Sequence, residues 1–384
     1  MASFDPLSTH TPFMQRCCQL AQRAAGYTAP NPLVGSVIVQ QGQIVGEGFH
    51  SRAGESHAEV FALRAAGDQA QGATLYVNLE PCNHHGRTPP CTEAIIQAQV
   101  SRVVIGMADP NPEASGGIER LRAAGIEVMV GIEEAACRQL NEAFIHRIQH
   151  HWPFGILKYA MTLDGKIATA TGHSAWVTGQ AARQRVHQLR GVCDAVIVGG
   201  NTVRQDNPQL TSHGECDRNP LRVVMSRRLE LPKAAHLWQV DTAPTLVFTQ
   251  PNSSRDFQKV LRQRGVEVVT LTELTPATVM AHLYERGLLS VLWECGGTLA
   301  AEAIRQGAVQ KVWAFIAPKL IGGTTAPGPV GELGLTQMTA ALPLSQVSFS
   351  SVGSDICVEG YLVPTPAATQ SKAQPKLPLE ELGA

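Results

Sequence analysis

Residues Ser56–Val60 read SHAEV, and residues Pro81–Cys91 read PCNHHGRTPPC. The first stretch places a carboxylate two positions after an imidazole, and the second places two cysteines directly after prolines. One imidazole and two thiolates form a neutral ligand set for a catalytic Zn²⁺, which takes three protein ligands and keeps one position open for water. His57, Cys82 and Cys91 are therefore predicted to bind zinc.

Glu59 completes this group in a different role. Residues two apart on a helix do not share a face, so His57 and Glu59 can serve one site only at the start of the helix predicted over 57–66. Glu59 then reaches the zinc-bound water rather than the ion. We expect it to carry a proton from that water to the departing nitrogen.

Both cysteines follow sequences that favour a thiolate. Cys82 comes after the strand predicted over 73–79, at the end where α/β sheets hold their sites. Thr88–Pro90 is predicted to form the cap and first turn of a helix over 91–99. The sulfur of Cys91 would then lie at the positive end of that helix, which stabilises its negative charge.

The residues alone leave two alternatives to a catalytic zinc site open. Cys82 and Cys91 form a disulfide in the first. In the second, His84 or His85 supplies a fourth ligand to a structural zinc, as in a nucleic-acid-binding module. The formal net charge of -1, from 31 basic and 32 acidic residues, gives no field to attract polyanions or acidic membranes. No nucleic-acid or membrane partner is therefore expected, and the partner predicted is a small-molecule substrate.

The 384 residues predict two α/β domains. In residues 1–150, the order β-β-α-β-α-β-α-β after an initial helix over 15–25 predicts three layers. A helix over 133–148 ends this domain, and strands alternate with helices again over 151–364. Residues 365–384 are rich in Pro, Ala and Gln and are expected to be disordered.

Cysteine usage and hydropathy bear on the compartment. The nine cysteines are odd in number and scattered, which favours reduced thiols over a disulfide framework. No apolar run approaches the roughly 18 residues of a membrane helix, and the first residues do not resemble a secretion signal. We therefore expect a cytoplasmic protein.

The motifs TAPNPLVG, GEGFH, HAEV, EPCNHHGRTPPC and DPNP, in this order, make the stretch from about 10 to 145 similar to the deaminase domain of the bifunctional riboflavin biosynthesis proteins. The zinc nucleobase deaminases share the H-x-E and P-C elements, although their cysteines are closer together. The resemblance implies a cytidine deaminase-like fold and the substrate 2,5-diamino-6-(ribosylamino)-4-pyrimidinone 5′-phosphate. It also implies that Glu59 is the proton donor and that His84 and His85 are loop residues. Implied substrate contacts are Asn31, His50, Arg87, Asp109 and Asn111.

Two strand-to-glycine turns in the second half, AVIVGGNTV and VLWECGGTLAAEAI, leave backbone N–H groups free to hold phosphate. No G-x-G-x-x-G fingerprint accompanies them, so a standard Rossmann site is not supported. KYAMTLDGKIA, SAWVTG, DAVIVGGNTVRQDNPQLT, LRVVMS, WECGGTLA and IAPKLIGG resemble the reductase domain of the same family over about 153–363. That resemblance implies a dihydrofolate reductase-like α/β fold and NADPH as cofactor.

The reductase resemblance also names residues. Implied NADPH contacts are Ala160, Trp176, Thr202, Asp206, Ser226, Gly296, Gly297, Thr298, Leu299, Ala300, Ala301 and Glu302. Implied substrate contacts are Ser174, Arg190, Leu210, His213 and Glu294. From the residues alone, Trp176 is a core aromatic and Asp206 a turn residue.

Three positions depart from the family pattern. The loop after Pro112 is one residue shorter, His213 stands where an Arg is common, and Met225 stands where an Asp is common.

We expect a bifunctional enzyme that deaminates its substrate with zinc and then reduces the ribosyl group with NADPH, giving 5-amino-6-(5-phosphoribitylamino)uracil. The alternative is a chain with one working domain, the reductase. We also expect a homo-oligomer, a dimer or a tetramer.

Overall fold

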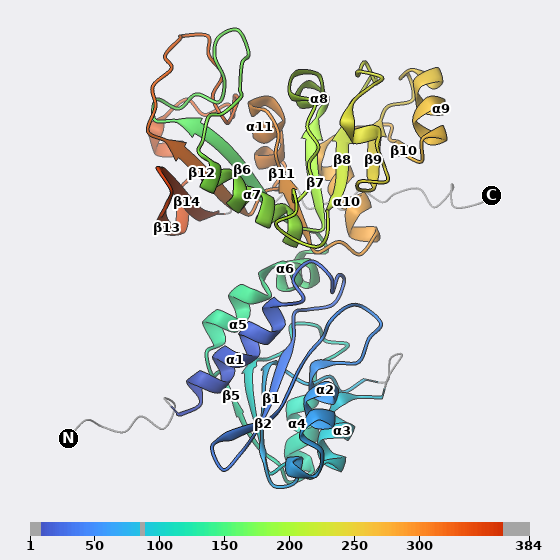
Figure 1. Ribbon diagram of the computed structural model, residues 1–384, viewed down its shortest axis with the longest axis vertical. Coiled ribbons are helices and arrows are strands. Elements are labelled where there is room, and N and C mark those ends of the chain that lie inside the picture. Colours follow the sequence, from blue (N-terminus) through green and yellow to red (C-terminus); the bar gives the residue numbers. More distant parts are fainter. Residues whose placement is uncertain (1–8, 85–88, 364–384) are drawn as a thin grey trace. The chain divides into compact units, whose positions relative to one another are not determined.

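The computed structural model describes residues 9–84 and 89–363 (Figure 1). The chain divides into two compact units, Met1–Trp152 and Pro153–Ala384. Residues 365–384, expected to be disordered, lie outside the described part of the chain. None of the helices in the described ranges combines the length and the apolar character needed to span a membrane.

The first unit is built on a five-stranded sheet with the order β2-β1-β3-β4-β5. β1 is antiparallel to β2 and β3, whereas β3, β4 and β5 are parallel. The strands are β1 (Gly35–Gln40), β2 (Gln43–Phe49), β3 (Thr74–Leu79), β4 (Arg102–Met107) and β5 (Glu127–Val130). The helices are α1 (Thr11–Gln22), α2 (Ala58–Ala66), η2 (Gly67–Ala70), α3 (Cys91–Gln97), α4 (Gly117–Ala123), α5 (Glu134–Leu140) and α6 (Glu142–His150).

Helices cover both faces of this sheet. Ala62 of α2 and Leu121 of α4 pack with α3 in the core on one face. Met14 of α1, Cys137 of α5 and Ile145 of α6 pack in the core on the other. The three-layer α/β arrangement predicted for the first domain is thus confirmed.

The helix expected over 133–148 is instead two helices, α5 and α6, which meet at Asn141. The side chain of Asn141 accepts a hydrogen bond from the Leu33 N–H at 2.8 Å and donates one to the Leu33 carbonyl at 3.0 Å. The break between the helices therefore lets the buried side-chain amide of Asn141 bind both the N–H and the carbonyl of Leu33, which lies in a loop 108 residues earlier.

Two other helix boundaries also differ from the prediction. α1 begins at Thr11, with a proline in its first turn, and ends at Gln22. Pro90, with φ -56° and ψ 141°, is the cap residue of α3 and lies before its first turn, and Thr88 lies outside the described residues. Cys91 is still the first helical residue, and its sulfur still lies at the positive end of the helix.

The second unit is built on a nine-stranded sheet with the order β10-β9-β8-β7-β11-β6-β12-β14-β13. The strands are parallel from β10 to β12, and β14 and β13 are added antiparallel. The strands are β6 (Phe154–Thr162), β7 (Ala195–Gly199), β8 (Leu221–Met225), β9 (Thr245–Thr249), β10 (Glu267–Thr270), β11 (Ser290–Trp293), β12 (Lys311–Ala317), β13 (Leu344–Val352) and β14 (Asp355–Leu362). The helices are α7 (Gln180–Val192), α8 (Gly200–Asp206), η3 (His236–Trp238), α9 (Arg255–Gln263), α10 (Pro276–Glu285), α11 (Gly297–Arg305) and η4 (Met338–Ala340).

The central strands of this sheet are apolar runs, because parallel strands are buried on both faces. β7 is fully buried from Ala195 to Val198. Since β7, β8 and β11 are parallel, their carboxyl ends meet at one edge of the sheet. Gly200, Ser226 and Glu294 directly follow these three strands, so the glycine turns and the acidic residue lie at that edge.

Candidate active sites

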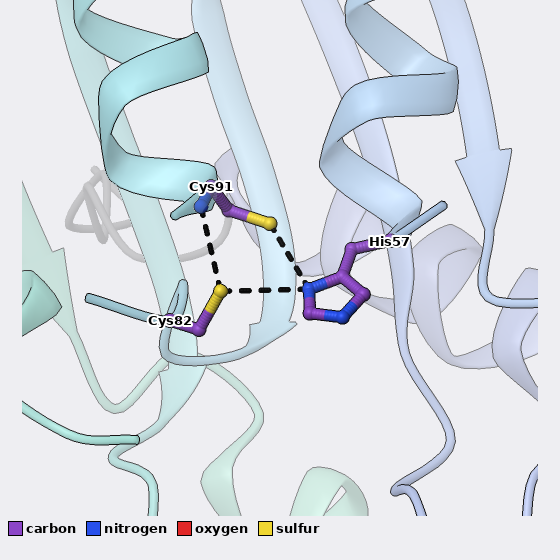
Figure 2. Close-up of side chains that lie close together, drawn as sticks. All are labelled: His57, Cys82 and Cys91. Atoms are coloured by element: carbon purple, nitrogen blue, oxygen red, sulfur yellow. Dashed lines mark hydrogen bonds between the residues drawn. The ribbon is translucent and has the colours of Figure 1, made fainter. Parts of the chain in front are cut away.

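The three predicted zinc ligands come together between the starts of two helices in the first unit (Figure 2). His57 is the residue before α2, Cys91 is the first residue of α3, and Cys82 lies in the loop after β3. His57 Nδ1 lies 3.2 Å from Cys91 Sγ and 3.5 Å from Cys82 Sγ. The backbone N–H of Cys91 donates to Cys82 Sγ at 3.4 Å.

These distances fit a tetrahedral zinc site. With Zn–S near 2.3 Å and Zn–N near 2.0 Å, tetrahedral geometry separates a nitrogen from a sulfur by about 3.5 Å. Both cysteines are free thiols, so the disulfide alternative is wrong. Within the described ranges, the metal-ligating group consists of these three residues; His84 is exposed, and His85 lies outside those ranges. A three-ligand set leaves one position for water, as a catalytic site requires.

Glu59 lies in the first turn of α2, as the spacing argument requires, and its side chain is 3% exposed. Its Oε2 is buried and has no hydrogen-bond partner among the described groups. Burial, together with the nearby Cys82 thiolate, raises the pKa of Glu59 to about 7. A buried carboxyl oxygen without a partner fits a group that exchanges a proton with a bound water or substrate.

Asn31 and His50, two of the implied substrate contacts, lie beside the zinc ligands. Asn31 Nδ2 is 3.0 Å from His50 Nε2, and His50 Nδ1 is 3.1 Å from the Ser56 carbonyl oxygen. The His50 and His57 rings meet edge to face with centroids 5.5 Å apart. Burial lowers the pKa of His50, which favours the neutral ring.

Glu80 is a residue of this site that the sequence analysis missed. Its buried carboxylate accepts hydrogen bonds from the N–H groups of Asp109 at 3.0 Å, Gly116 at 3.0 Å and Ile118 at 3.1 Å. Asp109 Oδ1 in turn accepts from the Asn111 N–H at 2.8 Å. Burial raises the pKa of Asp109 to about 6. Glu80 thus positions the loop that carries two implied substrate contacts, and its place just before Pro81-Cys82 was the available signal.

The shortened loop after Pro112 is held by its own backbone bonds. The N–H groups of Ala114 and Ser115 both donate to the Asn111 carbonyl at 3.0 Å, and the Asn83 N–H donates to the Ala114 carbonyl at 3.2 Å. A Cβ at Gly117 would overlap the Pro81 carbonyl oxygen, so only glycine fits there. Arg87, the remaining implied contact, lies outside the described ranges.

In the second unit, Glu294 joins two cations. Arg190 binds it bidentately, with Nε–Oε1 at 2.6 Å and Nη2–Oε2 at 3.0 Å, and Lys158 Nζ lies 3.6 Å from Oε2. Burial would raise the pKa of Glu294, but Arg190 and Lys158 outweigh it and hold the pKa at about 2. Lys158, on β6, was missed because its motif KYAMTLDGKIA indicated only Ala160, two residues along the same strand.

His213 lies close to this ion-pair group. Its ring stacks on that of His187 in α7, with centroids 4.2 Å apart and an angle of 25° between the planes. Burial and the Arg190 charge lower the pKa of both rings, that of His187 to about 4. Both imidazoles are therefore neutral near pH 7. Leu210 is 2% exposed, and Arg190 donates to the Thr211 carbonyl nearby at 3.1 Å.

Two of the implied contacts, Ser174 and Asp206, meet at the end of α8. Ser174 Oγ donates to Asp206 Oδ1 at 2.7 Å, which joins a residue implied to contact substrate to one implied to contact NADPH. Trp176 is 69% exposed, so it is not a core aromatic, and the Arg183 guanidinium lies 4.4 Å from its ring centroid. Thr202 lies in the same helix, α8.

The second glycine turn begins α11. Gly296 precedes the helix in extended conformation, and a Cβ at Gly297 would lie 2.9 Å from the Gly328 carbonyl oxygen. The Gly331 N–H donates to the Gly297 carbonyl at 2.9 Å. The rest of the implied segment forms the first turns of the helix: Thr298, Leu299, Ala300, Ala301 and Glu302.

Family models match both units. The model for the cytidine and deoxycytidylate deaminase zinc-binding region matches residues 7–107, and the model for the RibD C-terminal domain matches residues 153–358. The riboflavin biosynthesis protein RibD of Synechocystis is 63% identical over 350 residues, which are 91% of this chain and 95% of that protein. The chain belongs to the RibD family. RibD proteins are deaminase and reductase enzymes of riboflavin biosynthesis, so the first unit is the deaminase domain and the second the reductase domain.

Solved structures of RibD proteins share this fold. A RibD of Acinetobacter baumannii has a TM-score of 0.83 and 38% identity, covering 93% of this chain and all of that one (100%). A diaminohydroxyphosphoribosylaminopyrimidine deaminase/5-amino-6-(5-phosphoribosylamino)uracil reductase from Thermotoga maritima also has a TM-score of 0.83, at 36% identity, covering 94% and 100%. The two-domain α/β fold inferred from the motifs is confirmed, and no finding favours a chain with one working domain.

Proposed function

We propose that this RibD chain deaminates 2,5-diamino-6-(ribosylamino)-4-pyrimidinone 5′-phosphate and then reduces the ribosyl group of the product with NADPH. The observation that carries the proposal is the three-ligand group with the unpaired Glu59 oxygen beside it, in a chain that also has the reductase domain. The name of the Thermotoga relative, which specifies both reactions, supports the choice of substrate.

In the deaminase domain, His57, Cys82 and Cys91 would hold zinc, which when bound makes a water nucleophilic near neutral pH. Glu59 Oε2 would take a proton from this water when the water adds to the carbon bearing the 2-amino group. Glu59 Oε2 would then deliver that proton to the departing nitrogen, which leaves as ammonia. Asn31 and His50, which hydrogen-bond to each other, and the Asp109–Asn111 loop fixed by Glu80 would orient the pyrimidine.

In the reductase domain, the turns at Gly200 and Gly296 and the residues named with them would hold NADPH, which when bound supplies a hydride. Reduction at the ribosyl C1′ would open the sugar ring, and the ring oxygen would then need a proton. Lys158 is the ammonium in the Glu294 group, and burial lowers its pKa, which favours release of a proton. Glu294 and Arg190 fix the position of that ammonium.

A coupled assay tests the proposal. Purified protein is given the diaminopyrimidinone phosphate, and ammonia release and NADPH oxidation are followed together. We expect both, with ammonia first. NADPH oxidation of pre-deaminated substrate without any ammonia release, in protein that holds zinc, would leave the reductase as the only activity.

We further propose a homo-oligomer in the cytoplasm. β13 is an edge strand, and its Phe349 and Val347 are 73% and 40% exposed, which suits burial against a second copy. All nine cysteines are free thiols, as in a reducing compartment. Sedimentation of the purified protein would distinguish a monomer from a dimer or tetramer.

Replacement of His213 by arginine is expected to lower the KM of the reduction about five-fold, with little change in kcat. A permanent guanidinium charge binds a phosphate more strongly than a neutral imidazole does, by about 1 kcal/mol. KM is measured with pre-deaminated substrate at pH 7.5. The control is His213→Gln, which stays neutral and should not lower KM; an unchanged KM in His213→Arg would mean that position 213 does not contact the substrate phosphate.

A further inference from the structure

A second pair of cysteines lies in contact in the deaminase domain, away from the zinc ligands. Cys18 of α1 and Cys137 of α5 are 119 residues apart in the chain, and their Sγ atoms are 3.7 Å apart. Cys137 is fully buried, Cys18 is half-buried, and both are free thiols. We propose that these two residues form a reversible disulfide when a peroxide oxidant is present, so that the pair is a redox modification site.

The packing brings the sulfurs together and limits their movement. A disulfide bond is about 2.05 Å long, so the sulfurs must approach by about 1.7 Å, a distance that side-chain rotation can cover. Figure 1 shows α1 and α5 in one layer, and both contribute to the same core. A Cβ at Gly106 of β4 would overlap Cys137 Sγ. Cys137 is therefore seated against the sheet, and Cys18 is the side chain that moves.

The two thiols differ in ways that give each a role. Cys18 is the more accessible, and the hydrogen bond from the Cys137 thiol lowers its pKa, although burial and the Glu133 carboxylate oppose this. The same contact, together with burial, raises the pKa of Cys137. Cys18 is thus the attacking thiolate and Cys137 the resolving thiol, an arrangement found in redox-sensing cysteine pairs.

The chemistry balances with hydrogen peroxide as oxidant. The Cys18 thiolate attacks one peroxide oxygen, the O–O bond breaks, and the departing oxygen takes a proton and leaves as water. The Cys137 sulfur then attacks the Cys18 sulfenic sulfur, the S–O bond breaks, and the hydroxide takes the Cys137 proton. Two thiols lose two electrons and two protons, and one peroxide becomes two waters. A dithiol reductant restores both thiols.

The position of the pair links it to the deaminase site. α1 ends at Gln22 and leads into the loop of Asn31 and Leu33, and α5 ends one residue before Asn141, whose side chain holds both backbone groups of Leu33. A bond between Cys18 and Cys137 therefore ties together the two helices that support this loop. It also closes a long loop of chain, which restricts the unfolded state and stabilises the domain.

The test uses the zinc-loaded full-length chain, treated with hydrogen peroxide and digested with trypsin without reduction. We expect a linked peptide pair, 17–23 with 123–138, that is 2 Da lighter than the sum of its parts and separates on reduction. Because Cys17 lies in the same peptide but is fully buried, Cys17→Ala is the matched control and should still form the link. Cys18→Ser and Cys137→Ala should each abolish it.

Unfolding provides a second readout that does not depend on the proposed reactions. Oxidised wild type should unfold in the deaminase domain at a higher denaturant concentration than the reduced protein, and oxidised Cys18→Ser should show no such shift. Zinc content is followed in parallel so that oxidation of the ligand cysteines is recognised. The proposal is overturned if no link forms at peroxide concentrations that oxidise the partly exposed Cys216, or if Cys18→Ser forms the same link.

Discussion

The Glu59→Gln variant should bind zinc normally and release ammonia at least about 100-fold more slowly than the unchanged enzyme, the usual contribution of a general acid–base group. The amide keeps the size of the side chain, and Glu59 is not one of the three ligands. An amide cannot take up a proton at Oε2 and return it to the leaving nitrogen. The loss should therefore appear in kcat for deamination rather than in metal affinity.

Three measurements isolate this effect. Zinc per chain is determined by elemental analysis, ammonia release is measured at saturating substrate, and reduction is measured with pre-deaminated substrate. Glu119→Gln is the matched control because Glu119 is an exposed carboxylate on α4 of the same domain. A Glu59→Gln protein with full zinc and wild-type ammonia release would show that another group moves the proton.

The zinc group could be predicted because its information is local. The spacing of His57 and Glu59 required a helix start, and the residue after a proline pair began the next helix. Each ligand was thus tied to the end of an element that the apolar pattern had already located. Pro90 is the cap of α3, but the expectation that the prolines also form its first turn was wrong, because proline restricts φ and the sequence does not say whether it lies inside the helix or before it.

The supporting residues could not be predicted, because their partners are distant in the sequence. Glu80 binds backbone groups 29 to 38 residues later, and Asn141 binds Leu33 across 108 residues. Asn141 also breaks a helix whose apolar pattern continues on both sides of it. Hydrophobic periodicity reports which face of an element is buried, and it contains nothing about which buried polar group accepts which N–H.

Strand order is a further feature that the pattern of elements left open. β11 lies between β7 and β6 although it comes after both in sequence, and this places Glu294 where it meets Lys158 of β6 and Arg190 of α7. The resemblance named Arg190 and Glu294 as separate substrate contacts. Only the strand order shows that they form one ion-pair group with Lys158.

Replacement of Glu294 by glutamine should destabilise the reductase domain by about 3–5 kcal/mol, because it leaves two buried cations without a counter-charge. Arg190 also loses its bidentate partner, and its displacement should slow reduction by about 100-fold. Deamination should continue at the wild-type rate. The measurements are denaturant unfolding of the full chain and NADPH oxidation with pre-deaminated substrate.

The pH dependence has a defined sign. Glu294 has a folded pKa of about 2, below its ordinary value of 4.5, so its stabilisation is fully present above about pH 4.5 and is lost as the pH falls toward 2. Wild type should therefore lose stability over this window more steeply than Glu294→Gln does. If the free energy of unfolding changed with pH in the same way in the two proteins, Arg190 and Lys158 would not be holding the Glu294 carboxylate ionised.

A double variant separates charge from packing. If Glu294→Gln loses stability because the Lys158 ammonium has no counter-charge, the further change Lys158→Met should restore part of that stability. It removes the charge while keeping a side chain of similar length. Glu294→Gln/Lys158→Met should then be more stable than Glu294→Gln alone by about 0.5–3 kcal/mol, the range of coupling between contacting residues. Reduction should not recover with the stability, since Lys158 is the proposed proton donor. Recovery of the rate would show that Lys158 is not the proton donor.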